Sequence, residues 1–350
     1  MKPRSMGRAG PQDERVTMKH GAGGRAMREL IERTLAVGFL EGDTDQVGLA
    51  ALDDGAALRI GDRWLVITTD SHVIHPVFFP GGDIGRLAIA GTVNDLAMMG
   101  ATEVLGLTSA VVIEEGFLQA DLERIQLSMQ QACREAEATI VTGDTKVMGR
   151  GELDGIIITT TGVALADDVV TDAGLAPGDK IILSGPIGAH GIALMAARRG
   201  LGIEGELRSD VAPINGLIRC ALSAAPGAIS AMKDPTRGGL ASAVTEMAEK
   251  SEVGIVIVEA AVPITPTVSS AAEMLGLDPF HIANEGMAVL GVRPDDAEKV
   301  LEALHSHPQG KSGAVIGTCT EDHAGRLILD TGFGRRLVTE PEGEPLPRIC

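Results

Sequence analysis

The segment from Asp83 to Gly100, with the sequence DIGRLAIAGTVNDLAMMG, predicts a long helix that ends at a glycine. We expect this helix to run from Asp83 to Met98, because Gly100 stands at the position after the helix end where glycine is preferred. Asp95 would then lie in the last turn, where the helix dipole disfavours a carboxylate. A residue placed against its local preference is a candidate for function.

Strands and helices are predicted on both sides of this helix. Before it, residues 64–69 alternate as a strand does and lead to Asp70, Ser71 and His72 at the strand end. After it, we expect a strand at residues 102–113 and an amphipathic helix at 118–138. A short strand at 140–142 should lead into Gly143-Asp144-Thr145-Lys146, and a buried strand should follow at 156–164.

The pattern breaks into an acidic, turn-rich link at residues 167–177, where we expect a domain boundary. Beyond it we expect strands at 180–184, 254–258 and 287–292 and helices at 192–199 and 240–250. Glycines at 185–191 do not have the GxGxxG spacing of a dinucleotide site. Strands and helices alternate without a regular βαβ rhythm. The sequence therefore predicts two α+β domains, at residues 20–167 and 168–338, with a flexible leader (1–19) and a mobile tail (339–350).

The composition excludes some classes of partner. The chain has 350 residues, enough for two domains, and a formal net charge of −18 from 30 basic and 48 acidic side chains. This charge makes nucleic acid and anionic membranes poor partners, and a phosphate ligand would have to bring its own cations. The four cysteines are too few and too scattered for a disulfide framework. Neither a signal sequence nor a membrane-spanning run is present, so we expect a cytoplasmic protein.

The chain ends at Cys350, after a segment with three prolines and a glycine in residues 340–349. Such a segment favours an extended, solvated conformation that could act as an arm with a thiol at its end. A terminal cysteine can also be an accident of sequence. A prenylation signal is disfavoured, because Pro347 stands where that chemistry requires the cysteine.

Acidic residues stand at the predicted ends of elements in the first domain: Asp53-Asp54, Asp70, Asp95 and Asp144. Each alone is better explained as a turn cap, but the set, beside Lys146 and glycine-rich loops, favours binding of Mg²⁺ and a polyphosphate. The glycines at 21–24 ahead of a helix starting at Arg25 could bind an anion, although a plain turn is commoner. The helix at 240–250 could be capped by Thr236 or Asp234.

Six motifs carry a resemblance to a known family: Asp53-Asp54-Gly55-Ala56, Thr69-Asp70-Ser71-His72, Phe79-Pro80-Gly81-Gly82-Asp83, Val93 to Gly100, Thr142 to Lys146, and Asp234-Pro235-Thr236-Arg237-Gly238-Gly239. They resemble the aminoimidazole ribonucleotide synthetase-like ATP-binding superfamily. With the ending Pro347-Arg348-Ile349-Cys350, the chain resembles the HypE family of carbamoyl dehydratases, which act in NiFe-hydrogenase maturation. The resemblance extends from about His20 to the last residue.

The resemblance implies a homodimer of two-domain subunits, with the dimer interface on the first domain, that binds ATP and Mg²⁺. A carbamoyltransferase, HypF, would load a carbamoyl group onto the terminal thiol. The enzyme would dehydrate it to a thiocyanate, and the cyanide would pass to iron on a HypC–HypD complex.

The resemblance also assigns residues to the site. The expected catalytic residues are Cys350, Lys146, Glu285 and His72. The expected metal ligands are Asp54, Asp70, Asp95 and Asp144, which also contact ATP together with Gly23, Gly24, Asn94, Thr236 and Arg237. Isolated histidines are more often structural, and for His190 the sequence favours no role. Met287 stands where a basic residue is more usual.

Two alternatives remain. Selenophosphate synthetase, of the same superfamily, would need a reactive cysteine near the glycine-rich N-terminal stretch, but the first cysteine is Cys133. The second alternative is a protein that binds nucleotide and serves as a scaffold for maturation partners, without catalytic turnover. Lys146, Glu285 and Cys350 argue against a scaffold, and only turnover would decide.

Overall fold

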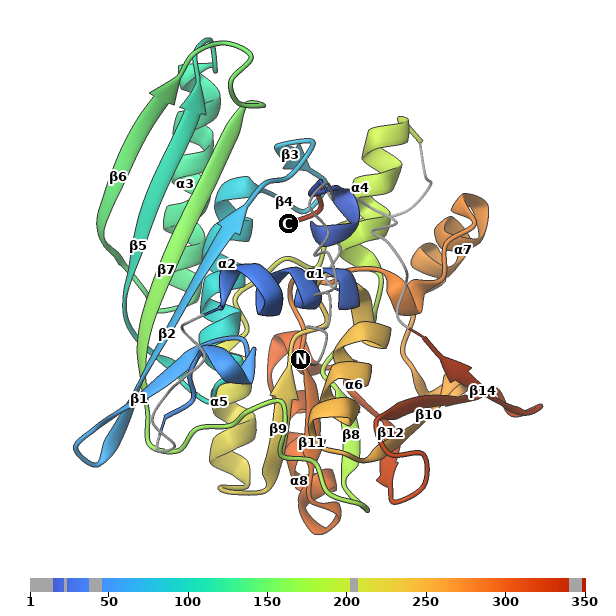
Figure 1. Cartoon of the computed structure of the whole chain (residues 1–350). Helices are drawn as coiled ribbons and strands as arrows, with labels where there is room; N and C mark the ends of the chain where they lie inside the picture. Colours follow the sequence, from blue (N-terminus) through green and yellow to red (C-terminus); the bar gives the residue numbers. More distant parts are fainter. Residues whose placement is uncertain (1–14, 22–23, 38–45, 202–206, 340–347) are drawn as a thin grey trace, which may run out of the picture.

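The computed structural model describes residues 15–21, 24–37, 46–201, 207–339 and 348–350. Two sheets with helices packed against them lie side by side (Figure 1), so the predicted two α+β domains are confirmed. Most of the predicted leader (1–14) and of the predicted mobile tail (340–347) lies outside the described residues. No helix in the described ranges is long and apolar enough to cross a membrane.

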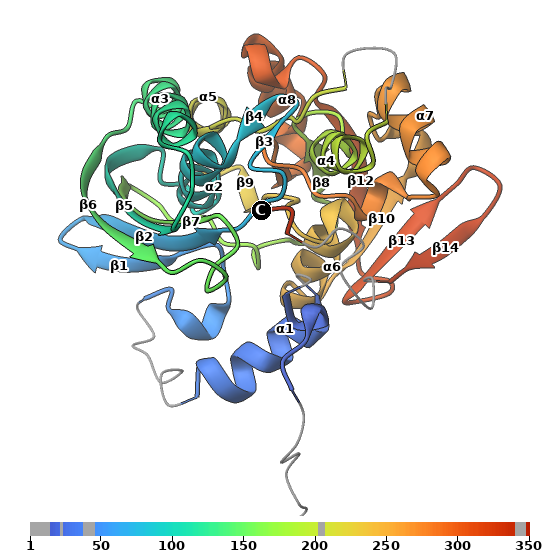
Figure 2. The ribbon, with the colours of Figure 1, turned by 90° about the horizontal axis from the view of Figure 1, so that it is seen from above.

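The first sheet has the strand order β1-β2-β7-β5-β6 and is antiparallel except for the β5–β6 pair. Helices α2 and α3 pack on one of its faces (Figure 2). The elements of this domain are β1 (Ala56–Ile60), β2 (Arg63–His72), β3 (Phe78–Phe79), β4 (Gly82–Asp83), α2 (Ile84–Met98), β5 (Glu103–Glu114), α3 (Gln119–Glu135), β6 (Ile140–Met148) and β7 (Ile156–Ala166).

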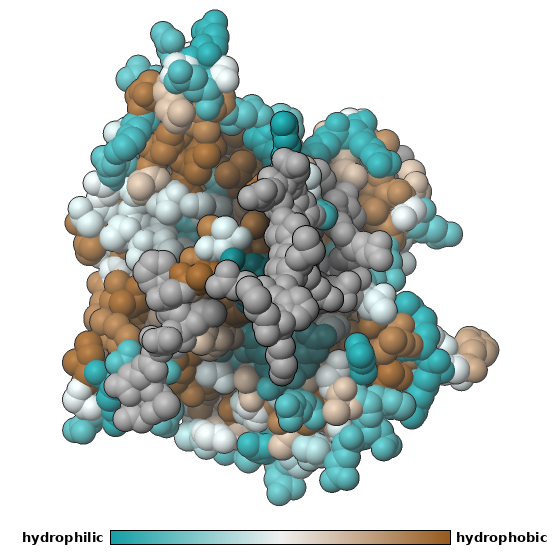
Figure 3. Space-filling view, in the orientation of Figure 1, coloured by the Kyte–Doolittle hydropathy of each residue, from teal (hydrophilic) through white to brown (hydrophobic). Residues whose placement is uncertain are grey.

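The other face of this sheet, called the open face below, is not covered by a helix of the described chain. Alternate residues of β7 are buried under the helices, and the ones between them are half-exposed on the open face. Figure 3 shows apolar side chains on the surface over β5, β6 and β7. Strand β6 forms the edge of the sheet, and its residues after Ile140 are exposed. An exposed apolar face next to an unpaired edge is typical of an interaction surface.

The second sheet has the order β14-β13-β10-β12-β8-β11-β9, with only the β10–β13 pair parallel. The elements of this domain are β8 (Lys180–Leu183), α4 (Ala189–Arg199), α5 (Asn215–Ala224), β9 (Ile229–Lys233), α6 (Gly239–Lys250), β10 (Gly254–Val258), α7 (Pro266–Leu275), β11 (Val289–Val292), α8 (Ala297–Ser306), β12 (Ala314–Thr320), β13 (Arg326–Asp330) and β14 (Arg335–Val338). A short helix, α1 (Arg25–Leu30), continues as a π-helical turn to Leu35 and lies across the front of both domains in Figure 1.

Helix α2 is the central helix of the fold, and its predicted limits are correct. Asp83 caps it by accepting hydrogen bonds from the Gly85 and Arg86 N–H groups at 2.8 and 3.0 Å. Gly100, with φ of +80°, follows the helix end as predicted. The helix is apolar on nearly all sides because it is buried by its own sheet, by α3 and by the second domain.

Several predicted element ends are wrong. Strand β2 continues through His72, so Asp70 lies inside the strand. Strand β6 continues to Met148, because each residue from Thr142 onward has a register partner on β5. Helix α6 has Gly238 as its N-cap, at a φ of +80°, so neither Thr236 nor Asp234 caps it. Strand β9 has no counterpart among the predicted strands.

Candidate active site

A cavity of about 540 Å³ lies between the two domains and is lined by residues of both. From the first domain, strand β2 contributes residues 67–70 and α2 contributes Gly91 and Asp95. From the second domain, the end of β9, the loop after it and the start of α6 contribute Lys233, Asp234, Thr236, Arg237, Ser242 and Ala243. Helix α1 and residues 48–56 form a further, more apolar wall. Glu285 and the terminal Cys350 also line the cavity.

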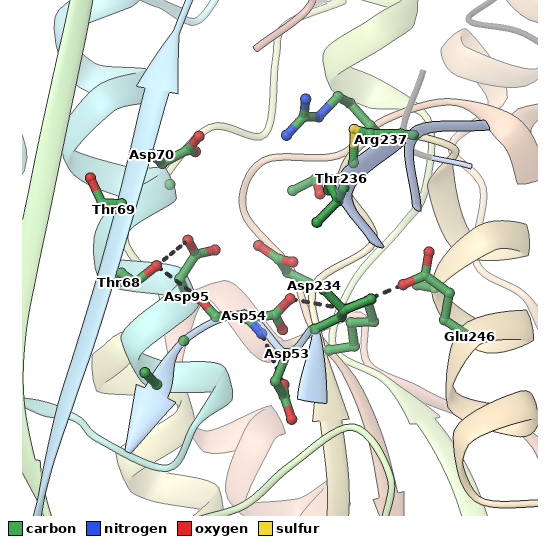
Figure 4. A pocket seen from close by; sticks show the side chains of 18 of the residues that line it. Asp53, Asp54, Thr68, Thr69, Asp70, Asp95, Asp234, Thr236, Arg237 and Glu246 are labelled. Atoms are coloured by element: carbon green, nitrogen blue, oxygen red, sulfur yellow. Dashed lines mark hydrogen bonds and ion pairs between the residues drawn. The ribbon is translucent and has the colours of Figure 1, made fainter. Parts of the chain in front are cut away.

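Seven carboxylates line this one cavity: Asp53, Asp54, Asp70, Asp95, Asp234, Glu246 and Glu285. Figure 4 shows the first six of them. Thr68 connects two of them, because its hydroxyl lies 2.8 Å from the Asp54 carbonyl oxygen and 3.1 Å from the Asp95 carboxylate. The structure therefore brings together Asp54, Asp70 and Asp95, three of the four predicted metal ligands. Thr236 and Arg237 line the same cavity, as predicted for ATP contacts.

Burial and mutual repulsion raise the pKa values of four of these carboxylates, Asp53, Asp95, Asp234 and Glu285. Burial, followed by the charges of Asp234, Asp70 and Asp54, raises the pKa of Asp95 well above its usual range. Burial and the Asp54 charge raise the pKa of Asp234 to about 8. Burial and Asp172 raise the pKa of Asp53 to about 7. Such a cluster favours the binding of a cation that would offset the repulsion.

The donor atoms fit a divalent cation that also has phosphate ligands. Oδ2 of Asp54 and Oε1 of Glu285 are buried without a hydrogen-bond partner in the structure. Unpaired carboxylate oxygens are the ligands that Mg²⁺ prefers. No three acidic, histidine or cysteine side chains of the described residues are arranged to hold a metal by themselves. A metal here would therefore need further oxygen ligands.

Asp70 differs from its neighbours because a histidine supports it. His72 Nε2 lies 3.1 Å from Asp70 Oδ2, and the His72 ring is only 1% exposed. Burial alone would raise the pKa of Asp70, but the hydrogen bond and charge of His72, with the charge of Arg237, lower it below the usual range. His72 itself does not line the cavity. Its position is that of a residue that orients Asp70.

Lys233 is the buried cation of the site, and the sequence analysis did not identify it. Its Nζ lies 2.9 Å from Asp54, 3.2 Å from Asp172 and 3.4 Å from Glu246. Burial disfavours the charged amine, but these three carboxylates raise the pKa of Lys233 well above its usual range. Because Lys233 lies at the end of β9 and its partners lie on α6 and on two loops, this ion network joins the domains beneath the cavity.

The variant Lys233→Met is expected to lower the free energy of unfolding by about 3–5 kcal/mol, because it leaves buried carboxylates without a partner. The midpoint of urea unfolding measures this loss. Arg219→Met is the matched control: it removes an exposed ion pair with Glu137 (2.9 Å), which contributes about 0–1 kcal/mol. Equal losses in the two variants would contradict the assigned network.

The last three residues are docked beside the cavity. The N–H groups of Val73 and His75, just beyond β2, donate to backbone oxygens at the chain end, Val73 to the carboxylate of Cys350 at 3.2 Å and His75 to the carbonyl oxygen of Arg348 at 3.3 Å. The Ile349 side chain is buried, with 2% exposure. The Arg198 guanidinium donates to the Arg348 carbonyl oxygen at 2.5 Å. Together these contacts bring the end of the chain, with its thiol, to the carboxylate cluster.

Glu285 is positioned by hydrogen bonds to its backbone. Asp210 Oδ2 accepts from the N–H groups of Glu285 and Gly286, both at 3.1 Å. Asn94 Nδ2 donates to the Glu285 carbonyl oxygen at 3.3 Å. The side chain is 3% exposed, and burial, followed by the charges of Asp234 and Asp210, raises the pKa of Glu285 well above its usual range.

Other predicted site residues lie elsewhere. Asn94 does not line the cavity but bridges α2 to the second domain, donating to Ala212 and accepting from Ile214. Gly24 is the buried N-cap of α1 and lies outside the lining, and Gly23 is outside the described residues. Asp144 and Lys146 do not line the cavity of their own chain.

Asp144 and Lys146 instead pair with each other at 2.5 Å on β6. Asp144 belongs to a row of paired residues that crosses the sheet from β6 to β2. Along the row the partners are Asp144 on β6, Ala110 on β5, Thr159 on β7 and Ser71 on β2. Residues in one such row point to the same side of a sheet. Three strand spacings, roughly 14 Å, therefore separate Asp144 from the β2 backbone beside Asp70. Both β6 residues lie on the open face.

Family models and known proteins were compared with this chain. Models of AIR synthase related proteins match both halves, the N-terminal domain at residues 52–166 and the C-terminal domain at residues 176–330. The carbamoyl dehydratase HypE of Azotobacter vinelandii is 46% identical over 338 residues, which cover 96% of this chain and 97% of the relative.

Two solved structures of HypE also resemble the chain. A chain in the crystal structure of a HypE–HypF complex has a TM-score of 0.82 and 42% identity, covering 89% of this chain and 99% of that chain. The crystal structure of the hydrogenase maturation protein HypE in complex with ATP has a TM-score of 0.79 and 38% identity, with 95% and 99% covered. The chain thus belongs to the AIR synthase related family and, within it, to the HypE carbamoyl dehydratases of hydrogenase maturation.

Proposed function

We propose that this chain uses ATP to dehydrate a carbamoyl group carried on its own Cys350 thiol to a thiocyanate, the source of the cyanide ligands of the NiFe-hydrogenase iron. One observation carries the proposal: Cys350 lines the same cavity as Glu285 and the aspartate cluster. A thiol at the end of a chain would have no reason to dock there in a protein that only binds nucleotide.

The chemistry requires the carbamoyl oxygen to leave, and oxygen is a poor leaving group until it is phosphorylated. Attack of this oxygen on the γ-phosphorus of ATP breaks the bond to ADP, and one N–H proton leaves as the C=N bond forms. Breaking the C–O bond then releases phosphate, and the second N–H proton leaves as the nitrile forms. The balance is one ATP consumed, with ADP, phosphate and the S-cyano group as products.

Glu285 is the proposed base for these protons. It lies in the cavity with Cys350, and its Oε1 has no hydrogen-bond partner in the structure. A carboxylate whose pKa is raised is a stronger base than an exposed one. The N–H groups of Glu285 and Gly286 are fixed by Asp210, so the backbone that carries the base is held in place.

The phosphates of ATP are proposed to lie between the aspartate cluster and the start of α6. Arg237 and the α6 N-terminus supply positive potential on that side. Asp54, Asp70 and Asp95 would hold Mg²⁺ on the other, with His72 orienting Asp70. The metal would offset the charge on the phosphates during transfer. The cavity walls would keep water from hydrolysing the O-phosphorylated thiocarbamate intermediate.

We further propose a homodimer formed through the open face. The face is half apolar, it is uncovered in one chain, and the cavity lining reaches it at Ile67 and Thr69. A second copy packed on this face would bring its Asp144 and Lys146 toward the cavity, where the amine could offset phosphate charge. This arrangement would account for two predicted site residues that the cavity of one chain lacks.

Mixing two inactive variants would test this arrangement. Lys146→Ala and Glu285→Gln homodimers are each expected to be inactive, whereas a mixture allowed to exchange subunits should regain activity, because each mixed dimer has one site with both residues intact. Cyanide release is the readout. Continued inactivity of the mixture, with exchange verified by light scattering of differently sized tagged chains, would show that Lys146 does not act across an interface.

The partners follow from the chemistry at each end of the reaction. HypF is proposed to load the carbamoyl group onto Cys350, and a HypC–HypD complex is proposed to accept the cyanide. The known HypE–HypF crystal structure supports the first of these.

Mass spectrometry of the C-terminal peptide tests the proposed function. The chain is incubated with HypF and its substrates, with and without Mg–ATP. We expect a carbamoyl adduct on Cys350 that loses one water only when ATP is present. An unmodified Cys350 on a chain that still binds ATP would instead support a nucleotide-binding scaffold.

A further inference from the structure

His190 is a buried polar residue that the reaction above does not use. It is the second residue of α4, has 0% exposure and does not line the cavity. Its Nε2 lies 2.8 Å from the carbonyl oxygen of Ile349, the residue before Cys350. Its Nδ1 lies 2.7 Å from the Ser209 hydroxyl. The Phe79 ring meets the imidazole edge-on, with ring centroids 5.5 Å apart, which fixes the plane of the ring.

The positions of the protons on these groups follow from their partners. Burial lowers the pKa of His190 to about 4, so the ring is neutral at physiological pH. A carbonyl oxygen only accepts, so Nε2 must carry the proton and donate to Ile349. Nδ1 then accepts from the Ser209 hydroxyl, whose oxygen in turn accepts from the Val211 N–H at 3.0 Å. Three hydrogen bonds therefore run in one direction, from Val211 to the docked end of the chain.

Asp210, the residue after Ser209, contacts the backbone of Glu285, the proposed base. Asp210 accepts from the Glu285 and Gly286 N–H groups. The approach is so close that a Cβ added at Gly286 would stand 2.0 Å from the Asp210 carbonyl oxygen. Ser209 and Asp210 are thus adjacent residues with two related contacts. Ser209 contacts His190, which holds the backbone of Ile349, and Asp210 holds the backbone of Glu285.

We propose that His190, oriented by Ser209, is a positioning residue that sets the Cys350 thiol in register with Glu285. The inference deepens the proposed function and rests on it for the effect on the reaction, although the docking of Ile349 can be measured without any reaction. It predicts that the His190 hydrogen bond increases the fraction of molecules in which the chain end is docked.

Docking is measured by alkylation of the full-length chain with N-ethylmaleimide, without nucleotide, followed by peptide mass spectrometry. Cys350 should react more slowly when docked, and the half-buried Cys220 on α5 is an internal reference. We expect His190→Phe to raise the Cys350 rate, relative to Cys220, about three- to tenfold, as for the loss of one buried hydrogen bond. Ser209→Ala is a smaller change that keeps the His190 ring, and it should also raise the alkylation rate of Cys350 relative to Cys220.

Two further variants separate positioning from folding. His190→Gln retains an amide donor and should restore most of the wild-type rate. His305→Phe is the matched control, because His305 Nε2 also lies 2.8 Å from a carbonyl oxygen, that of Gly313, but on the exposed side of α8. His305→Phe should leave the alkylation rates of both Cys350 and Cys220 unchanged. If His190→Phe does not fold, Ser209→Ala and His190→Gln still report on the contact.

The effect on the reaction is measured by a single turnover of the carbamoylated chain at saturating ATP. His190→Phe should slow dehydration, because fewer molecules hold the thiol in register with Glu285, and the Kd for ATP should be unchanged. An unchanged Cys350 alkylation rate in both His190→Phe and Ser209→Ala would overturn the inference. A wild-type chain that docks but does not dehydrate would instead overturn the proposed function, and the alkylation result would stand.

Discussion

The Cys350→Ala variant is expected to release no cyanide while binding ATP as tightly as the wild type. Without the thiol there is no atom to carry the carbamoyl group, so the loss should be complete. The aspartate cluster, Thr236 and Arg237 that are proposed to contact ATP are unchanged. Cyanide release measures the first effect and isothermal titration calorimetry with Mg–ATP the second.

Cys220→Ala is the control for this variant, because Cys220 is also a half-buried cysteine outside any disulfide but lies on α5, outside the cavity lining. It should retain full activity. Residual cyanide release from Cys350→Ala would show that another group carries the carbamoyl. Loss of ATP binding in the same variant would show that the chain end takes part in the nucleotide site and would contradict the division of labour proposed here.

The Glu285→Gln variant is expected to accumulate the carbamoylated form of Cys350 and to convert it about 10²–10⁴ times more slowly, the range for loss of a general base. Loading by HypF should continue, because the amide occupies the same volume and leaves the backbone contacts to Asp210 in place. Mass spectrometry of the C-terminal peptide over time distinguishes loading from dehydration.

The same substitution at Glu298, an exposed glutamate in the first turn of α8, is the control and should have no effect. Dehydration at the wild-type rate in Glu285→Gln would remove Glu285 from the reaction. Failure of loading in that variant would place its role before dehydration.

The sequence predicts well those parts of the molecule that local preference determines. Helix α2 was predicted to its last residue, because Asp83 is a strong cap and Gly100 takes a left-handed conformation after the helix end. Asp95 was also predicted as a candidate site residue, because a carboxylate in the last turn of a helix is unfavourable, and the structure places it in the cavity lining. The resemblance supplied Glu285 and the role of Cys350.

The sequence does not predict what depends on distant partners. Lys233 was missed because its carboxylate partners Asp54, Asp172 and Glu246 are far from it in the chain. Asp144 and Lys146 were expected in a loop at the site, but pairing with β5 extends the strand through them and turns them to the open face. His190 gave no sign of its role, since its two partners are Ser209 and a backbone atom of the last residue but one.

The way the chain end is held bears on the direction of the reaction cycle. The hydrogen bonds described above from Val73, His75, His190 and Arg198 go to backbone oxygens of residues 348–350. These oxygens are the same whether the sulfur carries hydrogen, carbamoyl or cyanide. The bonds therefore stabilise the loaded, reacted and empty forms equally, and a contact that does not distinguish two states cannot shift the balance between them. Net flow from loading to delivery must then be driven by a free-energy difference elsewhere, and the proposed consumption of ATP beside the thiol would supply one.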